Sequence, residues 1–211
     1  MTAQADASSP DKKTLLVFGD SLSAAYGMDS RKGWVNLLQE KMAESHPQWR
    51  VINASISGET TAGGHSRLPK ALQNHSPDLV LLELGANDGL RGTPLQQIEK
   101  NIADMVQLTK QQGIDTLLFE MRIPPNYGPA YTSRFREIFQ QVAQSHNILL
   151  LPFFLEGVAG IPSLNQPDGI HLNEQAQPRL MNNVWFYLEP RLSEAQVKSE
   201  GTKMKSIGYS G

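Results

Sequence analysis

The sequence predicts a single α/β domain built around a parallel sheet. Short apolar runs alternate with longer segments in which apolar residues recur at helical spacing, and this alternation continues over most of the chain. The short runs are nearly continuous in apolar residues, which is typical of strands covered on both faces. A chain of 211 residues is long enough for one well-buried domain and short for two. We therefore expect strands and helices connected by right-handed crossovers.

Five segments are predicted to be the strands of this sheet, with helices between them. The strands are expected at 14–19 (TLLVFG), 50–54 (RVINA), 78–84 (DLVLLEL), 115–121 (DTLLFEM) and 147–152 (NILLLP). In the segment 33–44, Trp34, Leu38 and Met42 stand four residues apart and would share one face of a helix. Further helices are expected where apolar stripes recur, within 95–113, which ends at Gly113, at about 131–145 and at about 173–191.

The composition excludes several classes of function. The formal net charge is −2, which argues against a nucleic-acid partner. The chain has no cysteine, so disulfides and thiolate zinc sites are excluded. Its apolar stretches fall short of the roughly 18 residues that span a bilayer, so no stable membrane insertion is expected. No ligand-spaced pair such as His-Glu-x-x-His occurs, and nothing indicates an obligate dimer, so we expect no metal, no cofactor and a monomer.

The two ends of the chain are polar and are left out of the predicted domain. Residues 1–13 (MTAQADASSPDKK) are expected to be a disordered N-terminal segment, and residues 193–211 a disordered C-terminal tail. The predicted domain is therefore 14–192. The letters AQA at 3–5 resemble the end of a cleaved secretory leader. We expect a periplasmic or secreted protein if a leader has been trimmed, and a cytoplasmic one otherwise.

Polar residues follow the ends of the predicted strands, where the active sites of open α/β sheets lie. Ser21 follows the first strand and is the candidate nucleophile. His171 is the candidate general base, and Asp168, three residues earlier on the same loop, is the candidate group that orients its ring. The candidate oxyanion donors are the backbone N–H groups of Ser21 and Gly58 and the side-chain amide of Asn87.

Each of these signals also has a plainer interpretation. Gly, Asp and Ser are ordinary turn residues, Asn87 precedes Asp88-Gly89, and a glycine after a strand needs no catalytic role. The polar strand ends would also suit a non-catalytic module that binds a small ligand. The loop 123–131 (IPPNYGPAY) is either part of a substrate entrance or only a proline-rich connection. The remaining histidines are expected to be structural: His46, His65, His75 and His146.

Four short motifs, taken together, resemble those of a known family. GDSLS at 19–23, Gly58 in NASISGETT, GANDG at 85–89 and DGIH at 168–171 are similar to the four blocks of the SGNH, or GDSL-type, serine hydrolases, in the same order. NASISGET, LGANDGLRG and LPFFLEGV are most similar to the TesA-type group of bacterial acyl-CoA thioesterases, lysophospholipases and arylesterases. Leu172 departs from that group, because proline is expected after the catalytic histidine.

The resemblance implies a flavodoxin-like three-layer α/β/α fold with a five-stranded parallel sheet. It implies ester or thioester hydrolysis without a metal, through an acyl-enzyme on Ser21, with the roles named above. It also implies that Asp20 is a structural hydrogen-bonding residue behind the nucleophile. A carbohydrate O-deacetylase on the same fold is the alternative. The loop implied to bind and cover the acyl chain consists of Gly89, Leu90, Arg91, Gly92, Thr93 and Pro94.

Overall fold

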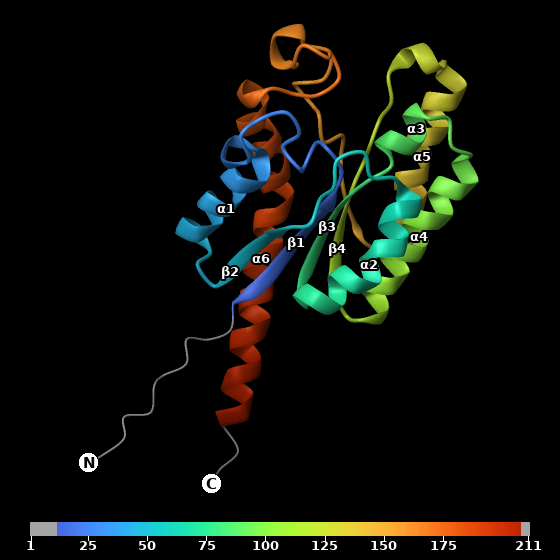
Figure 1. Ribbon diagram of the computed structural model, residues 1–211. Coiled ribbons are helices and arrows are strands. Elements are labelled where there is room, and N and C mark those ends of the chain that lie inside the picture. Colours follow the sequence, from blue (N-terminus) through green and yellow to red (C-terminus); the bar gives the residue numbers. More distant parts are fainter. Residues whose placement is uncertain (1–11, 208–211) are drawn as a thin grey trace.

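The structure, a computed structural model, describes residues 12–207 and confirms the α/β fold with a five-stranded parallel sheet (Figure 1). The strand order β2-β1-β3-β4-β5 is that of flavodoxin-like sheets. The strands β1, β3 and β4 are central, whereas β2 and β5 lie at the two edges and pair only with β1 and β4, respectively. The strands are β1 (Lys13–Gly19), β2 (Trp49–Asn53), β3 (Leu79–Glu83), β4 (Asp115–Phe119) and β5 (Leu149–Leu151).

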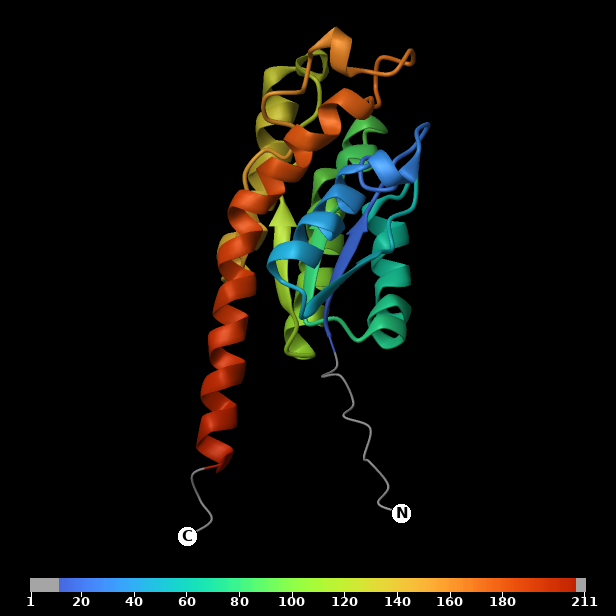
Figure 2. The same cartoon turned by 90° about the vertical axis from the view of Figure 1, so that its left-hand side faces the viewer.

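Helices cover both faces of the sheet. On one face α1 (Trp34–Ser45) packs against α6 (Gln177–Ile207), and on the other α4 (Leu95–Gln111) packs between α2 (Thr61–His75) and α5 (Pro129–His146). Figure 2 shows α6 running the full length of its face and continuing beyond the amino ends of the strands. A short helix, α3 (Ala86–Leu90), follows β3 at the opposite end. None of the helices in this part of the chain is long and apolar enough to cross a membrane.

The core lies between the sheet and its two helical layers. Leu15, Leu16, Val17 and Phe18 of β1 are all fully buried, as expected for a central strand covered on both faces. Burial of each such side chain is worth about 1.5–3 kcal/mol, so the central strands contribute much of the stability. The apolar stripe predicted within 95–113 lies on α4 and is confirmed, because four of its side chains are 0% exposed: Ile98, Ile102, Met105 and Val106.

The first helix begins without a capping side chain of its own. Its N-cap is Gly33, and the Trp34 N–H instead donates to Oε1 of Gln177, the first residue of α6, at 3.0 Å. This buried bond replaces the usual Ser, Thr, Asp or Asn cap. It ties the start of the first helix to the start of the last one.

Several predicted boundaries differ from the structure. The strands expected at 78–84, 115–121 and 147–152 are shorter, because ladder pairing ends at Glu83, Phe119 and Leu151. Residues 193–207 form the end of α6 and not a disordered tail, since helix-forming residues such as Glu194, Ala195 and Gln196 continue the helix. Most of the expected N-terminal segment, 1–11, lies outside the described residues, as does 208–211.

The strand order also fixes where a site can form. The chain moves outward from β1 to β2 and then returns to the other side of β1 to form β3. In open α/β sheets the crevice at such a reversal, at the carboxyl ends of the strands, is where ligands bind. The segments after β1 and β3 meet at this point, and they carry Ser21 and Asn87.

Candidate active site

Ser21, His171 and Asp168 come together at the carboxyl end of the sheet. The Nε2 atom of His171 lies 3.1 Å from Oγ of Ser21, although the two residues are 150 positions apart. Nδ1 of the same ring lies 2.7 Å from Oδ2 of Asp168. A nucleophile, a base and an orienting carboxylate at hydrogen-bonding distance are the geometry that activates a serine hydroxyl.

The loop that carries the candidate base, His171, is held by Asp168 itself. Its Oδ1 atom accepts the backbone N–H groups of Ile170 at 2.9 Å and His171 at 3.0 Å. The hydrogen bond with the His171 side chain, followed by these two backbone bonds, lowers the pKa of Asp168 to about 2. The carboxylate is therefore ionised at every pH at which the fold is expected to work, and can stabilise a positive charge on the imidazole ring.

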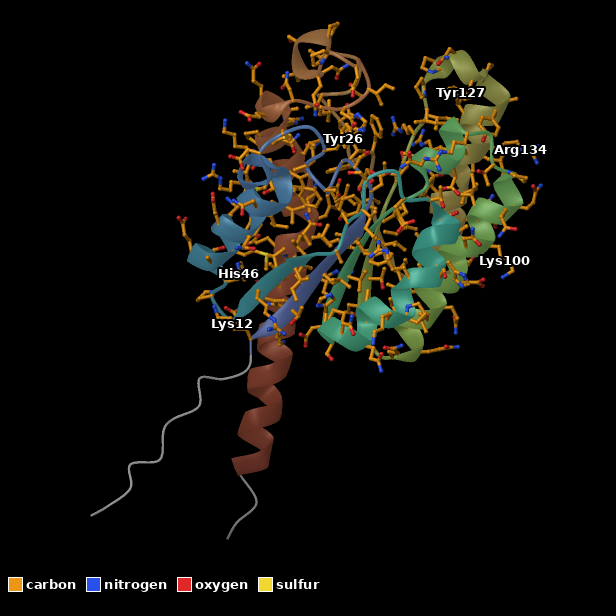
Figure 3. The ribbon with its side chains drawn as sticks, in the orientation of Figure 1. Lys12, Tyr26, His46, Lys100, Tyr127 and Arg134 are labelled. Carbon is orange, nitrogen blue, oxygen red and sulfur yellow. The ribbon has the colours of Figure 1, made fainter. Side chains whose placement is uncertain are left out.

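Two further residues hold His171 from the other side, and the sequence did not point to them. The ring of Tyr26 packs on the His171 ring with 4.4 Å between centroids. Gln166 donates from Nε2 to the carbonyl oxygens of Tyr26, at 2.7 Å, and of Leu172, at 3.0 Å. Figure 3 labels Tyr26 at the upper end of the molecule, where the loops after the strands gather. The position of Tyr26 five residues after the candidate nucleophile was the available signal.

Two of the candidate oxyanion donors are backbone N–H groups without a protein acceptor. Within residues 12–207 neither the Ser21 N–H nor the Gly58 N–H donates to another protein atom. Gly58 has φ = +77°, in the left-handed region that favours glycine, and is exposed. Both groups are therefore available to an incoming oxygen atom.

The third candidate donor, Asn87, is already engaged. Its Nδ2 atom donates to Oδ2 of Asp20 and to the carbonyl oxygen of Glu59, each at 3.0 Å. An amide nitrogen has only two hydrogens, so both are committed. An oxyanion would have to share or replace the Glu59 carbonyl, while Asp20 keeps the amide in place. Sequence reasoning could place Asn87 near Ser21 but could not detect this competition.

Two buried carboxyl groups lie behind the nucleophile. Asp20 and Glu83 are 1% and 0% exposed. Burial raises the pKa of Asp20 to about 6, against the opposing effects of the Leu22 N–H, His171 and the Asn87 amide. Burial, followed by the charge of Asp20, raises the pKa of Glu83 well above its usual range. The expected structural role of Asp20 fits its hydrogen bonds to Leu22 and Asn87.

The loop expected to cover the substrate begins inside α3. It is held by neighbouring segments through one side chain and one backbone group. Arg91 Nη2 donates to the Gly58 carbonyl at 3.3 Å, and the Leu90 backbone carbonyl accepts from the hydroxyl of Tyr127 at 2.9 Å. Tyr127 belongs to the proline-rich loop 123–131, so that loop contacts the site region. Movement of the segment 89–94 over an acyl chain stays a prediction.

Exposed apolar side chains gather on the segments that follow the strands. Among the described residues, six of the seven large hydrophobic side chains that are exposed lie after the carboxyl end of a strand, and each of the five strands is followed by at least one. Tyr26 and Tyr127, two of the six, are both at the upper end in Figure 3. The others are Ile56, Leu90, Ile161 and Ile170. An apolar acyl group would find contacts around Ser21.

No group of three or more His, Cys, Asp or Glu residues suited to a metal ion occurs between residues 12 and 207. The other histidines of this range lie away from the triad; His46, for example, is buried and packs on Trp185 with 5.7 Å between ring centroids.

Comparison with known proteins identifies the family. The model of the GDSL-like lipase/acylhydrolase family matches residues 17–178, which include all three triad candidates. The chain belongs to this family. It is 50% identical to "Esterase TesA" of Pseudomonas aeruginosa over 180 residues, 85% of this chain and 90% of the relative. It is 43% identical to "Thioesterase 1/protease 1/lysophospholipase L1" of Escherichia coli K12 over 177 residues, 84% of each chain.

The fold of this GDSL hydrolase agrees with a solved structure. A crystal structure of TesA superposes with a TM-score of 0.82 at 50% sequence identity and covers 84% of this chain and 99% of that one. The resemblance of the sequence to the SGNH hydrolases is thus confirmed. This GDSL hydrolase is an enzyme that cleaves small-molecule esters or thioesters.

Proposed function

We propose that the enzyme cleaves carboxylic esters and thioesters through an acyl-enzyme on Ser21, with His171 as general base and Asp168 as the residue that orients it. The observation that carries the proposal is the position of the His171 ring between Ser21 Oγ, 3.1 Å from Nε2, and Asp168 Oδ2, 2.7 Å from Nδ1. A module that only binds a ligand would not require this arrangement.

Catalysis follows from this geometry in two stages. Ser21 Oγ forms a bond to the carbonyl carbon while Nε2 of His171 takes the hydroxyl proton. The tetrahedral intermediate then loses its alkoxide or thiolate, which receives that proton from the imidazolium ring. Water repeats the sequence on the acyl-enzyme, with His171 as base again, and releases the carboxylic acid and free Ser21.

The developing negative charge on the carbonyl oxygen needs hydrogen-bond donors. We propose the N–H groups of Ser21 and Gly58 and the amide of Asn87 for this role. The first two lack protein acceptors in the described range, and Asp20 fixes the Asn87 amide beside them. The oxyanion would take the place of the Glu59 carbonyl as an acceptor for Asn87.

Replacing Asn87 with alanine is expected to lower kcat by about 10²- to 10³-fold, the usual effect of losing one side-chain oxyanion donor. KM for a small ester should change little, because the bond strengthens only in the transition state. Steady-state kinetics of p-nitrophenyl butyrate hydrolysis measures both. Asn36→Ala on α1, which removes an amide bonded to Glu40 and the Arg31 carbonyl, is the control. A wild-type kcat in Asn87→Ala would show that Asn87 is not an oxyanion donor.

The substrates we propose are aryl esters, acyl-CoA thioesters and lysophospholipids with apolar acyl chains. The exposed apolar side chains around the site, including Leu90 and Ile170, support acyl groups longer than acetyl. The names of the two relatives, an esterase and a thioesterase that is also a lysophospholipase, support the same classes. A periplasmic or secreted location, if a leader has been trimmed, and a monomeric state stay predictions.

A substrate panel tests this proposal. Initial rates are measured for p-nitrophenyl esters from acetate to palmitate, for acyl-CoA thioesters of the same lengths and for acetylated sugars. We expect kcat/KM to rise from acetate to medium acyl chains, because each added methylene buries more apolar surface. Preference for acetylated sugars over all longer acyl esters would instead select the O-deacetylase alternative. A folded enzyme that cleaved none of these substrates would contradict both.

A further inference from the structure

The carboxyl group of Glu83 is fully buried directly beneath the turn that carries the nucleophile. Glu83 is the last residue of β3 and lies beside Gly19 in the parallel ladder. Its Oε2 atom accepts the Ser23 hydroxyl at 2.7 Å and the Asp20 N–H at 3.2 Å. Its Oε1 atom has no hydrogen-bond partner within the described part of the chain. A charged glutamate would be costly here, because no cation among the described residues pairs with it.

The neighbouring carboxyl group, Asp20, has better support for a negative charge. Its Oδ1 accepts the Leu22 N–H and its Oδ2 accepts the Asn87 amide, so both oxygens have N–H donors. Two adjacent buried carboxyl groups cannot both ionise readily. Each accepts two hydrogen bonds, but both bonds to Glu83 fall on Oε2 and leave its Oε1 without a partner among residues 12–207, so Glu83 keeps the proton. Burial raises the pKa of Glu83 well above its usual range, which agrees with this assignment. The other titratable groups that act on this pair are His171 and Asp88.

We propose that Glu83, in its uncharged acid form, is a positioning residue that holds the nucleophile turn of Ser21. The proposal deepens the proposed function, since it rests on Ser21 being the nucleophile. Glu83 does not touch the substrate. It fixes the turn at two points, Ser23 and the Asp20 backbone, while Asp20 in turn fixes Asn87. One buried group thereby places both the nucleophile and an oxyanion donor.

The backbone beside Glu83 is shaped for this close contact. A Cβ atom at Gly19 would lie 2.5 Å from Oε2 of Glu83 and 2.9 Å from Oγ of Ser23. Only glycine leaves room for the carboxyl group at this position of the ladder. The contact therefore requires glycine at the first position of the GDSLS motif, Gly19.

Neither an apolar residue nor a charged one at position 83 could hold the nucleophile turn in the same way. An aliphatic side chain would leave the Ser23 hydroxyl and the Asp20 N–H buried without an acceptor. An ionised carboxylate would place a second negative charge beside Asp20 and close to the oxygen that becomes negative in the transition state. The neutral acid supplies the acceptor without that charge.

The test compares Glu83→Gln with Glu83→Leu in the full-length enzyme. Glutamine keeps an uncharged oxygen acceptor of the same length, so kcat should stay within about threefold of wild type. Leucine removes the acceptor, and kcat should fall about 10- to 100-fold with KM little changed, as expected when a nucleophile is displaced slightly. Thermal unfolding measured alongside the kinetics identifies variants that are merely less stable.

Glu120→Gln is a matched control. Glu120 is also a buried glutamate just after a strand of the same sheet, but it pairs with Arg122 and Arg136 rather than with the nucleophile turn. Glu120→Gln removes the negative charge from these ion pairs, so it should lower the melting temperature and leave kcat unchanged. Ser23→Ala breaks the same hydrogen bond to Glu83 from the other side without burying a new aliphatic chain, and should also lower kcat. It serves if Glu83→Leu does not fold.

Three outcomes would overturn the proposal. A Glu83→Gln variant as slow as Glu83→Leu would mean that the charge is required. Wild-type kcat in a folded Glu83→Leu or in Ser23→Ala would reduce Glu83 to a packing residue. An equal fall of kcat in Glu120→Gln would mean that loss of stability explains the effect. The Ser21→Ala variant tests the proposed function separately. If Ser21→Ala remained active, Ser21 would not be the nucleophile and the proposed function itself would fail.

Discussion

Replacement of Ser21 by alanine is expected to lower kcat for ester hydrolysis by about 10⁶-fold, the effect of losing a triad nucleophile. Alanine cannot form the acyl-enzyme, and His171 would have no hydroxyl proton to take. KM should stay within about threefold, since the hydroxyl makes little contribution to ground-state binding. Rates with p-nitrophenyl butyrate and with an acyl-CoA thioester measure the effect on both substrate classes.

Covalent labelling gives a second, independent reading of the same variant. An organophosphonate ester or fluoride should add to wild-type Ser21 and to a Ser133→Ala control, whose serine is exposed on α5 and bonded to Glu137. The Ser21→Ala enzyme should remain unlabelled in the intact mass. Equal turnover or equal labelling in Ser21→Ala would show that another residue is the nucleophile.

Asp168→Asn is expected to lower kcat by about 10⁴-fold, while the protein stays folded. The asparagine oxygen can still accept the backbone N–H groups of Ile170 and His171, so the loop should keep its shape. Its NH₂ group would then face Nδ1 of the ring and donate to it. The ring would carry its proton on Nε2, facing Ser21, and could not act as a base.

The pH dependence and a matched control sharpen this prediction. Because the pKa of Asp168 is about 2, the carboxylate stays ionised from pH 4 upward, and the loss in Asp168→Asn should be similar across pH 5–9. Asp29 also has a pKa of about 2 and also accepts a backbone N–H, from Arg31, but it does not contact the triad. Asp29→Asn should therefore keep wild-type kcat. A small loss in Asp168→Asn that matched Asp29→Asn would contradict the role of Asp168.

Local patterns in the sequence were enough to predict the layers and the candidate triad. The continuous apolar runs predicted the buried strands, and the three-residue spacing of Asp168 and His171 predicted a carboxylate and a ring on one loop. The strand order and the 3.1 Å approach of His171 to Ser21 depend on contacts far apart in the chain, which no local pattern encodes. The resemblance of the four ordered motifs to the SGNH hydrolases is what predicted that Ser21 and His171 lie together.

Other features depend on side-chain competition that a sequence does not display. Asn87 was predicted as an oxyanion donor, and nothing in the sequence indicated that its two hydrogens are bonded to Asp20 and to the Glu59 carbonyl. Glu83 lies in an otherwise apolar strand, and its ionisable side chain there was the available signal. The ring contact of Tyr26 with His171 depends on how two loops fold over each other. The length of α6 was underestimated because its polar end offers no core-facing stripe.

The bond between Gln177 and Trp34 has a consequence for how the enzyme is made. Ser21 follows the first strand, but its proposed base, His171, lies 150 residues later, on the loop just before α6. During synthesis the N-terminal part of a domain emerges first, so the nucleophile leaves the ribosome without its partner. The loop of His171 runs directly into α6, whose first residue, Gln177, bonds to the start of α1, so we expect docking of α6 and placement of His171 beside Ser21 to occur together. We therefore expect the growing chain to be inactive until α6 has docked, so that the onset of ester hydrolysis marks the completion of the fold.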